Sequence, residues 1–307
     1  MRATLKQSPS PVPVLVRNSP GVGANCNPPA APRSIRPVLE ITAQRGLLAV
    51  DLASVWRYRE LLYFLVLREL KVRYKQAALG AAWAVIQPVF AVIIFTLVFG
   101  IFARLPSDGL PYALFAFAGV VPWTYFSEAL RRSSTGLVED SELIRKIYFP
   151  RLVLPVSAVL APVIDLVISL VVFGFVMAWY RVTPGANLLL LPLFIALNVG
   201  LSLAFGLWLG PLNVRFRDIK HILPFFIQVW MYASPVVYPL SMVPERWRLL
   251  YSLNPMVGVI EGFRWALLGT TAPNPTAITM TIVMTSVLLA GGLLFFERAE
   301  RSFADVI

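Results

Sequence analysis

The chain has very few of the side chains that bind metals or form disulfides. Of its 307 residues, one is a cysteine, Cys26, and one is a histidine, His221. One cysteine excludes an intrachain disulfide and a multi-cysteine metal site, and one histidine argues against a histidine-rich metal or catalytic centre. The sequence also has no Walker loop, Gly-x-x-x-x-Gly-Lys-Ser/Thr, for nucleotide phosphates. We therefore expect no metal and no cofactor on this chain. If the protein uses ATP and Mg²⁺, another chain must bind them.

Charged residues are also scarce. They make up 14% of the sequence, against roughly a quarter in an ordinary soluble domain, while hydrophobic residues make up 58%. A water-soluble fold of this length could not bury so much apolar surface. The long apolar stretches instead predict an all-α integral membrane protein with six transmembrane helices. The expected spans are Ala84–Phe102, Tyr112–Phe126, Leu152–Tyr180, Leu188–Leu212, Ile222–Leu240 and Thr276–Phe296, the third of them bent by Pro155 and Pro162.

The 27 Lys and Arg residues are unevenly distributed around these stretches. Twenty-two lie before the first span, after the last, or in alternate connectors, and five lie in the other connectors: Arg104, Arg181, Arg246, Arg248 and Arg264. Lys and Arg near helix ends are retained on the cytoplasmic side. The pattern predicts a multi-pass protein of the bacterial inner membrane with both termini in the cytoplasm. The net charge of +11 does not indicate a nucleic-acid partner, because the basic residues flank apolar segments instead of forming one stripe.

Three regions are expected along the chain: a tail over residues 1–45, a cytoplasmic interface region over 46–80, and the transmembrane domain over 81–307. The first 39 residues contain eight of the 25 prolines, no acidic residue and no apolar run of signal-peptide length. Such a segment cannot bury enough surface to offset its ordering entropy. We expect a disordered, basic tail with weak attraction to anionic membrane lipid.

The segment Arg57–Lys75 predicts an amphipathic helix at the membrane surface. At 100° per residue, five charged side chains fall within about an 80° arc, and four apolar side chains lie away from it: Arg57, Glu60, Arg68, Lys71 and Lys75, against Leu62, Leu65, Val66 and Leu70. Phe64 interrupts the polar arc, and Glu69 and Arg73 interrupt the apolar face. The pattern fits a helix in the cytoplasmic interface better than a membrane span.

The connector between spans five and six, residues 241–275, contains a moderately apolar stretch, Leu249–Leu268. Two charges within it, Glu261 and Arg264, make a full crossing unfavourable. We expect short re-entrant helices that dip into the outer leaflet from the periplasmic side. Glu261 and Arg264 are three residues apart, so they can pair on one helical face.

Four groups of residues resemble one family. The first is Arg68-Glu69-Leu70-Lys71-Val72-Arg73-Tyr74-Lys75-Gln76, followed by Leu79-Gly80, Trp83 and Gln87-Pro88. The others are Asn213 with Arg217-Asp218, Ser234-Pro235 with Tyr238-Pro239, and Asn254-Pro255 with Glu261 and Arg264. In this order and topology, they resemble the type-2 permeases of ATP-binding-cassette (ABC) exporters for polysaccharides and polyol phosphates. Two departures are Ala77, where the family often has Ser, and the proline-rich tail.

This resemblance implies a permease that is not an enzyme by itself. It implies a homodimer that works with two copies of a cytoplasmic ABC ATPase, which binds ATP and Mg²⁺. The implied cargo is an undecaprenyl-diphosphate-linked glycan. O-antigen polysaccharide is the expected class, and teichoic acid and capsular polysaccharide remain open.

The resemblance also assigns expected roles to four sets of residues. The loop 130–150 suits contact with the ATPase, or is an ordinary solvated loop. Basic residues at the cytoplasmic surface could attract the lipid diphosphate, or reflect positive-inside retention alone. Aromatic residues could stack on sugars in the channel, or anchor the protein in lipid. The outer connector is the expected periplasmic gate. These sets are Glu139, Asp140, Glu142, Arg145 and Lys146 for coupling; Arg57, Arg59, Arg68, Lys71 and Arg73 for the lipid diphosphate; Trp123, Tyr125, Phe126, Phe225, Phe226, Trp230 and Tyr232 for the channel; and Asn254, Pro255, Glu261 and Arg264 for the gate.

Asp165 lies within the third span, where a charged group must face protein or water. A structural hydrogen bond between helices is favoured over a proton relay, because a relay needs further acidic partners.

Two other classes of protein remain open. A small-molecule efflux permease of the same superfamily would share the fold. A membrane glycosyltransferase or polymerase that acts on lipid-linked sugars would need an acidic pair, and Glu139-Asp140 is the only adjacent one.

Overall fold

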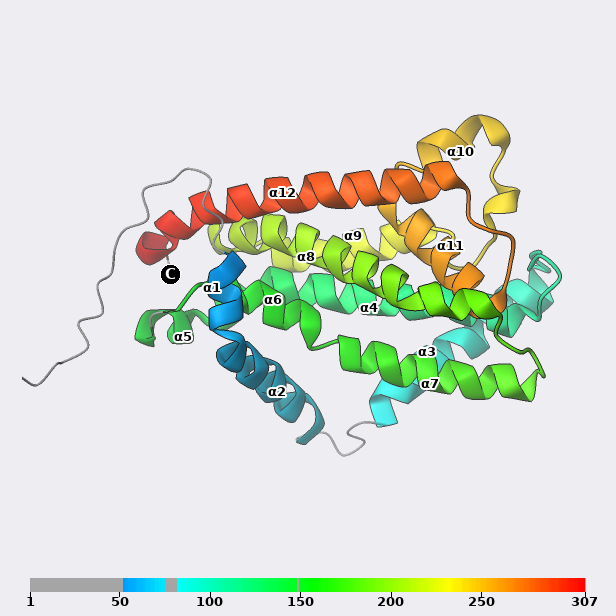
Figure 1. The fold of residues 1–307 in the computed structure, drawn as a ribbon, viewed down its shortest axis with the longest axis horizontal. Helices are drawn as coiled ribbons and strands as arrows, with labels where there is room; N and C mark the ends of the chain where they lie inside the picture. The colour runs from blue at the N-terminus through cyan, green and yellow to red at the C-terminus, as the bar shows by residue number, and fades with distance from the viewer. Residues whose placement is uncertain (1–51, 76–81, 148, 307) are drawn as a thin grey trace, which may run out of the picture. The chain divides into compact units, whose positions relative to one another are not determined.

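The computed structural model describes residues 52–75, 82–147 and 149–306, all of which lie in the compact unit Gly46–Ile307. The expected tail, residues 1–45, lies outside the described residues. Within the described ranges the chain forms helices and no β-strand (Figure 1). The expectation of an all-α protein is confirmed for this part of the chain.

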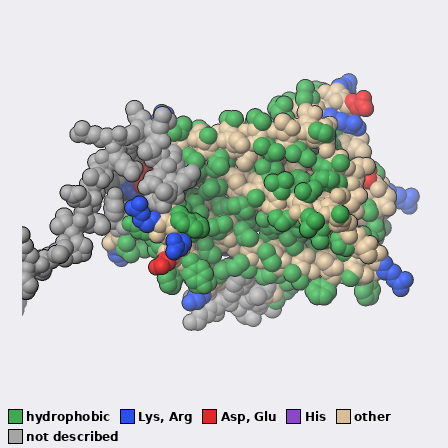
Figure 2. Space-filling model, in the orientation of Figure 1, with side chains coloured by type: hydrophobic (Ala, Val, Ile, Leu, Met, Phe, Trp, Pro, Cys, Tyr) green, Lys and Arg blue, Asp and Glu red, His purple; other side chains and the backbone are tan. Residues whose placement is uncertain are grey.

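Among the described residues, five helical stretches are long and apolar enough to cross a membrane: Val85–Phe102, Tyr112–Glu139, Val153–Trp179, Ala186–Arg215 and Pro275–Glu300. They correspond to α3 (Ala82–Phe95) with the π-helix η1 (Thr96–Phe102), α4 (Tyr112–Glu139), α6 (Val153–Leu160) with α7 (Val163–Trp179), the 3₁₀ helix η2 (Ala186–Leu190) with α8 (Leu191–Arg215), and α12 (Pro275–Val306). Figure 2 shows hydrophobic side chains over the middle of the visible face and charged side chains toward its two ends. The protein is a multi-pass membrane protein.

Helix α4 is the central element, and it packs against α3, α6, α7, α8, α9 and α11. The span expected at Tyr112–Phe126 lies within this helix, which continues to Glu139. Beyond Phe126, one face of α4 remains part of the core, because buried residues recur there at helical spacing: Ala129, Leu130, Ser133, Ser134 and Leu137. Arg131 and Arg132 lie on the other face. Twenty-eight residues give a helix of about 42 Å, longer than a hydrocarbon core of about 30 Å.

The expected bend in the third span is confirmed as a break between α6 and α7 (Figure 1). Pro162 stands immediately before α7, where its ring and missing N–H prevent a continuous helix. Pro155 lies near the start of α6 and does not interrupt it.

The fifth expected span, Ile222–Leu240, is not one spanning helix. Helix α9 covers Ile219–Tyr232, which is 14 residues or about 21 Å. It ends there because Pro235 follows, and the residue before a proline avoids the helical region. Residues 233–239, named here the non-helical segment, form turns in which Ser234, Pro235, Val236 and Val237 are buried.

The connector after this segment contains three short helices. These are η3 (Leu240–Met242), α10 (Glu245–Tyr251) and α11 (Pro255–Leu268). No residue of α10 is fully buried, whereas α11 is buried along most of its length against α4, α8 and α12. In Figure 1, α10 and the loop before α4 lie at one end of the described unit, and α5 and the C-terminal part of α12 lie at the other. We refer to these as the α10 end and the α5 end.

Two helices precede the first span: α1 (Leu52–Arg57) and α2 (Arg59–Lys75). The helix expected near Arg57–Lys75 is confirmed. Helix α2 packs against α6 and runs obliquely to α4 and α12 in Figure 1. Leu65 is buried as the pattern predicts, but Tyr63, Phe64 and Val72 are exposed. The apolar surface of α2 is therefore wider than one buried stripe.

Candidate functional site

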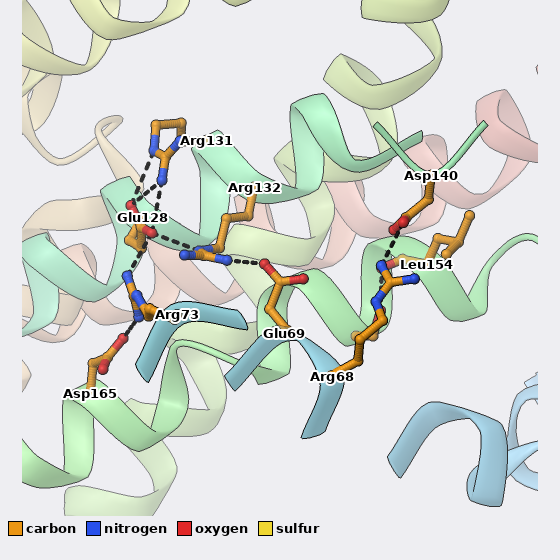
Figure 3. Close-up of polar contacts among 10 residues, drawn as sticks. Arg68, Glu69, Arg73, Glu128, Arg131, Arg132, Asp140, Leu154 and Asp165 are labelled. Carbon is orange, nitrogen blue, oxygen red and sulfur yellow. Dashed lines mark hydrogen bonds and ion pairs between the residues drawn. The ribbon is translucent and has the colours of Figure 1, made fainter. Parts of the chain in front are cut away.

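Eight charged side chains form ion pairs where α2 meets α4, α7 and the α4–α5 junction (Figure 3). Six of them form one network, and Arg68 and Asp140 form a separate pair beside it. We name this region the ion-pair cluster. It consists of four arginines and four carboxylates, so its formal charges balance: Arg68, Arg73, Arg131 and Arg132 with Glu69, Glu128, Asp140 and Asp165.

Within the ion-pair cluster, Glu128 of α4 is the most connected carboxylate. It accepts hydrogen bonds from Arg73 at 2.7 Å, from Arg131 at 2.9 Å and from Arg132 at 2.6 Å. Arg73 also bonds Asp165 of α7, and Arg132 also bonds Glu69 of α2. The favoured structural role of Asp165 is therefore supported, because its bond joins α7 to α2.

The spacing of the charges along each helix explains the ion-pair cluster. Glu69 and Arg73 are four residues apart on α2, and Glu128 is three and four residues before Arg131 and Arg132 on α4, so each group shares one helical face. Glu69 and Arg73 are the two residues that interrupt the apolar face of α2 in the sequence. The structure gives the reason, since that face of α2 meets charged residues of α4 and α7.

A cavity of about 450 Å³ lies beside the ion-pair cluster. Its walls combine cluster residues with apolar and small polar side chains of α2, α4 and α6, among them Leu65, Thr135, Leu154 and Ser157. Glu139 also lines it. The walls thus carry four arginines and three carboxylates, and each of these arginines already pairs with a carboxylate of the ion-pair cluster.

The five basic residues expected to attract a lipid diphosphate fall into two groups. Arg68 and Arg73 are part of the ion-pair cluster, so carboxylates already neutralise them. Arg57, Arg59 and Lys71 are exposed, and the Arg59 guanidinium lies 5.8 Å from the ring centre of Trp56. The exposed group is the better placed to meet an anionic ligand.

The five residues expected to couple to an ATPase lie together at the α5 end. Glu139 ends α4, and Asp140 is the single residue between α4 and α5 (Ser141–Lys146). Glu142, Arg145 and Lys146 are exposed on α5, and Glu142 pairs with Lys146 at 2.6 Å. The bond from Arg68 to Asp140 joins this set to α2.

The seven expected channel aromatics divide into three groups by their exposure. Trp123, Tyr125 and Phe126 of α4 are buried within this chain. Trp230 of α9 is half-buried, with ring centres 5.1 Å from Phe126 and 5.0 Å from Phe205. The others, Phe225, Phe226 and Tyr232 of α9, are exposed. Only the exposed three are available to a molecule outside the fold.

The four expected gate residues are brought together near the α10 end, where α11 meets the non-helical segment. Arg264 is the largest fully buried side chain among the described residues. Its Nη1 donates to Glu261 Oε1 at 3.0 Å, its Nη2 donates to the Val236 carbonyl at 2.8 Å, and its guanidinium lies 3.7 Å from the ring centre of Phe115.

Asn254 begins α11 and holds it against α9. Its side-chain oxygen caps the helix by accepting from the Met256 N–H at 3.1 Å, and it also accepts from Trp230 Nε1 at 3.0 Å. Its amide donates to the Ala233 carbonyl and to Ser234 Oγ. Pro255 occupies the first turn, where a missing N–H costs nothing, and Gly269 ends the helix with a φ of +64°.

The non-helical segment is stabilised by three side chains, one from α4 and two from α11 and its N-cap residue. Irregular backbone at membrane depth is tolerated only where its polar groups are satisfied within protein. Here Tyr112 of α4 donates to the Val237 carbonyl at 2.6 Å, Arg264 donates to Val236, and Asn254 donates to Ala233. Gly119 allows this close approach, because a Cβ there would lie 2.5 Å from the Val236 carbonyl oxygen.

Several residues of these sites were not assigned a role from the sequence. They are Glu69, Glu128, Arg131 and Arg132 of the ion-pair cluster, and Tyr112, Phe115 and Gly119 near Arg264. The charges that interrupt the apolar face of α2 were an available signal for the first group. The second group carried no signal, since its partners lie more than 100 residues away along the chain.

A sequence model of the ABC-2 type transporter family matches residues 60–268 of this chain. The O-antigen export system permease protein RfbA of Myxococcus xanthus is 30% identical over 256 residues, which cover 83% of this chain and 98% of the relative. The protein of the same name from Klebsiella pneumoniae is 26% identical over 81% of this chain and 95% of its own length. The polysialic acid transport protein KpsM of Escherichia coli is 24% identical over 78% and 93%.

Proposed function

Because the chain belongs to the ABC-2 type transporter family, we propose that it is the membrane-spanning permease of an ATP-driven exporter for lipid-linked O-antigen polysaccharide. The observation that carries the choice of cargo is the match over 98% of the Myxococcus xanthus permease. The match to the polysialic acid transporter extends over 93% of that protein, at lower identity. Capsular polysaccharide is therefore the second candidate cargo.

In this proposal, the polypeptide chain crosses the bacterial inner membrane six times. Helix α9 supplies about 21 Å of the fifth crossing, and the buried non-helical segment supplies the rest. Helix α11 enters from the α10 end and returns without crossing, as a re-entrant helix. An even number of crossings keeps both termini with the basic α5 end in the cytoplasm. Residues 1–45 are then a cytoplasmic tail, 46–80 the interface region and 81–307 the transmembrane domain.

The energy source in this proposal is a separate ABC ATPase in two copies, each with ATP and Mg²⁺, bound to a homodimer of this chain. Helix α5 is the proposed contact, because it is exposed and carries both charge signs at the end of the long helix α4. The permease itself catalyses no reaction. The ATPase drives export through Glu139, Asp140, Glu142, Arg145 and Lys146.

The proposed cargo is a glycan on undecaprenyl diphosphate. Exposed Arg57, Arg59 and Lys71 attract the diphosphate at the cytoplasmic surface, and the ion-paired Arg68 and Arg73 contribute less. Phe225, Phe226 and Tyr232 offer sugar-stacking surfaces along α9, with Trp230 and the buried α4 aromatics holding α9 in place. The outer gate in this proposal is formed by four residues of the outer connector: Asn254, Pro255, Glu261 and Arg264.

The test is reconstitution of this chain with its cognate ATPase in proteoliposomes loaded with fluorescent undecaprenyl-diphosphate-linked O-antigen polymer. We expect the polymer to become accessible on the opposite face only when ATP is present. An ATPase variant that lacks its Walker lysine is the matched control, and a polysialic acid polymer on a lipid carrier is the second cargo.

Three results would contradict the proposal. Export of the polysialic acid polymer in preference to O-antigen would favour the capsular cargo. Export of small amphiphilic dyes with no polymer export would favour a drug efflux permease. Glycosyl transfer by the purified chain alone would favour a membrane glycosyltransferase.

A further inference from the structure

We propose that the ion-pair cluster transmits movement of α5 to the surface helix α2. This inference rests on one part of the proposed function, that an ATPase binds α5. It assigns a positioning role to Glu69, Glu128, Arg131 and Arg132, and it changes the role of Arg68 and Arg73 from ligand attraction to transmission.

The first contact lies where α4 meets α5. Asp140 is the only residue between these helices, and its carboxylate bonds the guanidinium of Arg68 in α2 (Figure 3). Any displacement of α5 therefore moves a side chain that is bonded directly to α2.

The remaining contacts connect α2 to the membrane-spanning helices. Arg132 of α4 bonds Glu69, and Arg73 bonds Glu128 of α4 and Asp165 of α7. Three positions on α2 within six residues are thus tied to two other helices. Since the apolar side of α2 packs through Leu65 against α6, α2 follows its partners as one body.

The cluster can also adopt more than one arrangement. Glu128 accepts from three arginines, so one of them can exchange partners while the carboxylate stays satisfied. The adjoining cavity of about 450 Å³ leaves room for side chains to move, and Glu139 on its wall offers another carboxylate. Transmission requires discrete alternative arrangements of this kind.

The charge balance distinguishes this role from anion binding. A diphosphate in the cavity would have to displace carboxylates from arginines that are already paired. The exposed basic residues of α1 and α2 can bind a diphosphate without displacing a carboxylate of the ion-pair cluster. The cluster is therefore assigned to transmission and not to cargo.

The test exchanges the two charges of the Arg68–Asp140 pair, in which each residue has one ion-pair partner among the residues that the structure describes. We expect Arg68→Asp and Asp140→Arg alone to lower polymer exported per ATP hydrolysed by about fivefold or more, the size of a moderate coupling energy. The double variant should recover most of the loss. Arg248→Asp, which breaks the Arg248–Glu245 pair on α10, is the matched control and should retain the wild-type ratio.

A distance measurement decides the proposal independently of cargo. Spin labels at Glu60→Cys on α2 and Arg246→Cys on α10, in a Cys26→Ser background, report movement of α2 in the reconstituted complex. We expect the distance to change when a non-hydrolysable ATP analogue binds, to stay fixed in the single variants, and to change again in the double variant.

The outcomes separate the two proposals. If the wild-type complex exports no O-antigen polymer but the label distance responds as expected, the proposed cargo is wrong and the transmission role stands. The transmission role is overturned by a fixed distance in the wild-type complex. It is equally overturned by folded single variants that export normally, or by a double variant no better than either single one.

Discussion

At the scale of single residues, Arg264 shows how this fold accommodates a charge away from water. A buried guanidinium is tolerated when its donors and its charge are both satisfied. Glu261 supplies the charge, the Val236 carbonyl accepts a second hydrogen bond, and Phe115 offers a ring face. Removing the arginine would leave the Glu261 carboxylate buried without its partner.

Replacing Arg264 with Ala should lower the free energy of unfolding by about 3–5 kcal/mol, the usual cost of breaking a buried pair. Fluorescence-detected size-exclusion chromatography after heating would measure the loss in detergent. Arg248→Ala on α10, where the side chain is partly exposed, should cost less than about 1 kcal/mol. Equal melting of the two variants would disprove the central role of Arg264.

The aromatic residues allow a similar comparison between exposed and buried positions. Tyr232→Ala removes an exposed ring of α9, so we expect stability to change by less than about 0.5 kcal/mol. Polymer export should fall by about two- to tenfold, the value of one aromatic stacking contact. Phe126→Ala removes a fully buried ring and should cost about 3–5 kcal/mol of stability. Wild-type export by folded Tyr232→Ala would exclude this ring from the cargo path.

Local spacing predicted one of these contacts and could not predict the others. Glu261 and Arg264 were expected to pair because they are three residues apart on a helix, and the pair is confirmed at 3.0 Å. The Val236 carbonyl and the Phe115 ring lie 28 and 149 residues away, so only the tertiary fold brings them to Arg264. The ion-pair cluster has the same origin, since Arg73 and Asp165 are 92 residues apart.

At the scale of secondary-structure elements, α4 and α9 are the most informative pair. Helix α4 is longer than expected and touches both candidate regions, the ion-pair cluster through Glu128 and the non-helical segment through Tyr112. Helix α9 is shorter than expected because Ser234-Pro235 ends it. Apolar runs predicted where helices lie, but a hydropathy pattern cannot show that an apolar stretch loses its helix or that a charged stretch remains helical.

Two glycines of α4 test the close approach to the non-helical segment. In Gly119→Ala, the new Cβ would overlap the Val236 carbonyl and approach Arg264, so we expect a loss of about 1–3 kcal/mol in stability. Gly136→Ala places its Cβ in open space on the same helix and should be neutral or stabilising by up to about 1 kcal/mol. Thermal unfolding of both variants would measure the difference. A Gly119→Ala protein as stable as Gly136→Ala would contradict the packing described here.

At the scale of the whole molecule, charge distribution and hydropathy together predicted a multi-pass helical protein, and that expectation is confirmed. Among the described residues, five stretches are long and apolar enough to cross a membrane on their own. The sixth crossing is part of the proposed topology, which takes an even number from the distribution of basic residues and assigns the crossing to α9 with buried irregular backbone. Such backbone has no signature in hydropathy.

Cysteine labelling would test the proposed orientation, and Cys26 is the only native cysteine to remove. In a Cys26→Ser background, Glu245→Cys on α10 should react with a membrane-impermeant maleimide in intact spheroplasts. Glu142→Cys on α5 should react only after the membrane is opened. Labelling of both positions from outside would exclude the proposed topology.

The two charged regions along α4 differ in their contact with water, so we expect ionic strength to weaken one of them and to leave the other unchanged. Arg264 is enclosed by protein, so dissolved salt cannot screen its bond to Glu261. Arg68 of α2 is about half exposed, so counter-ions reach it and weaken its pair with Asp140. In the proposed topology, where the α5 end faces the cytoplasm, a higher cytoplasmic salt concentration would weaken the contact between α2 and the α4–α5 junction and leave the Arg264–Glu261 pair intact. If that contact transmits movement as proposed, the complex would then hydrolyse more ATP for each polymer exported under hyperosmotic conditions.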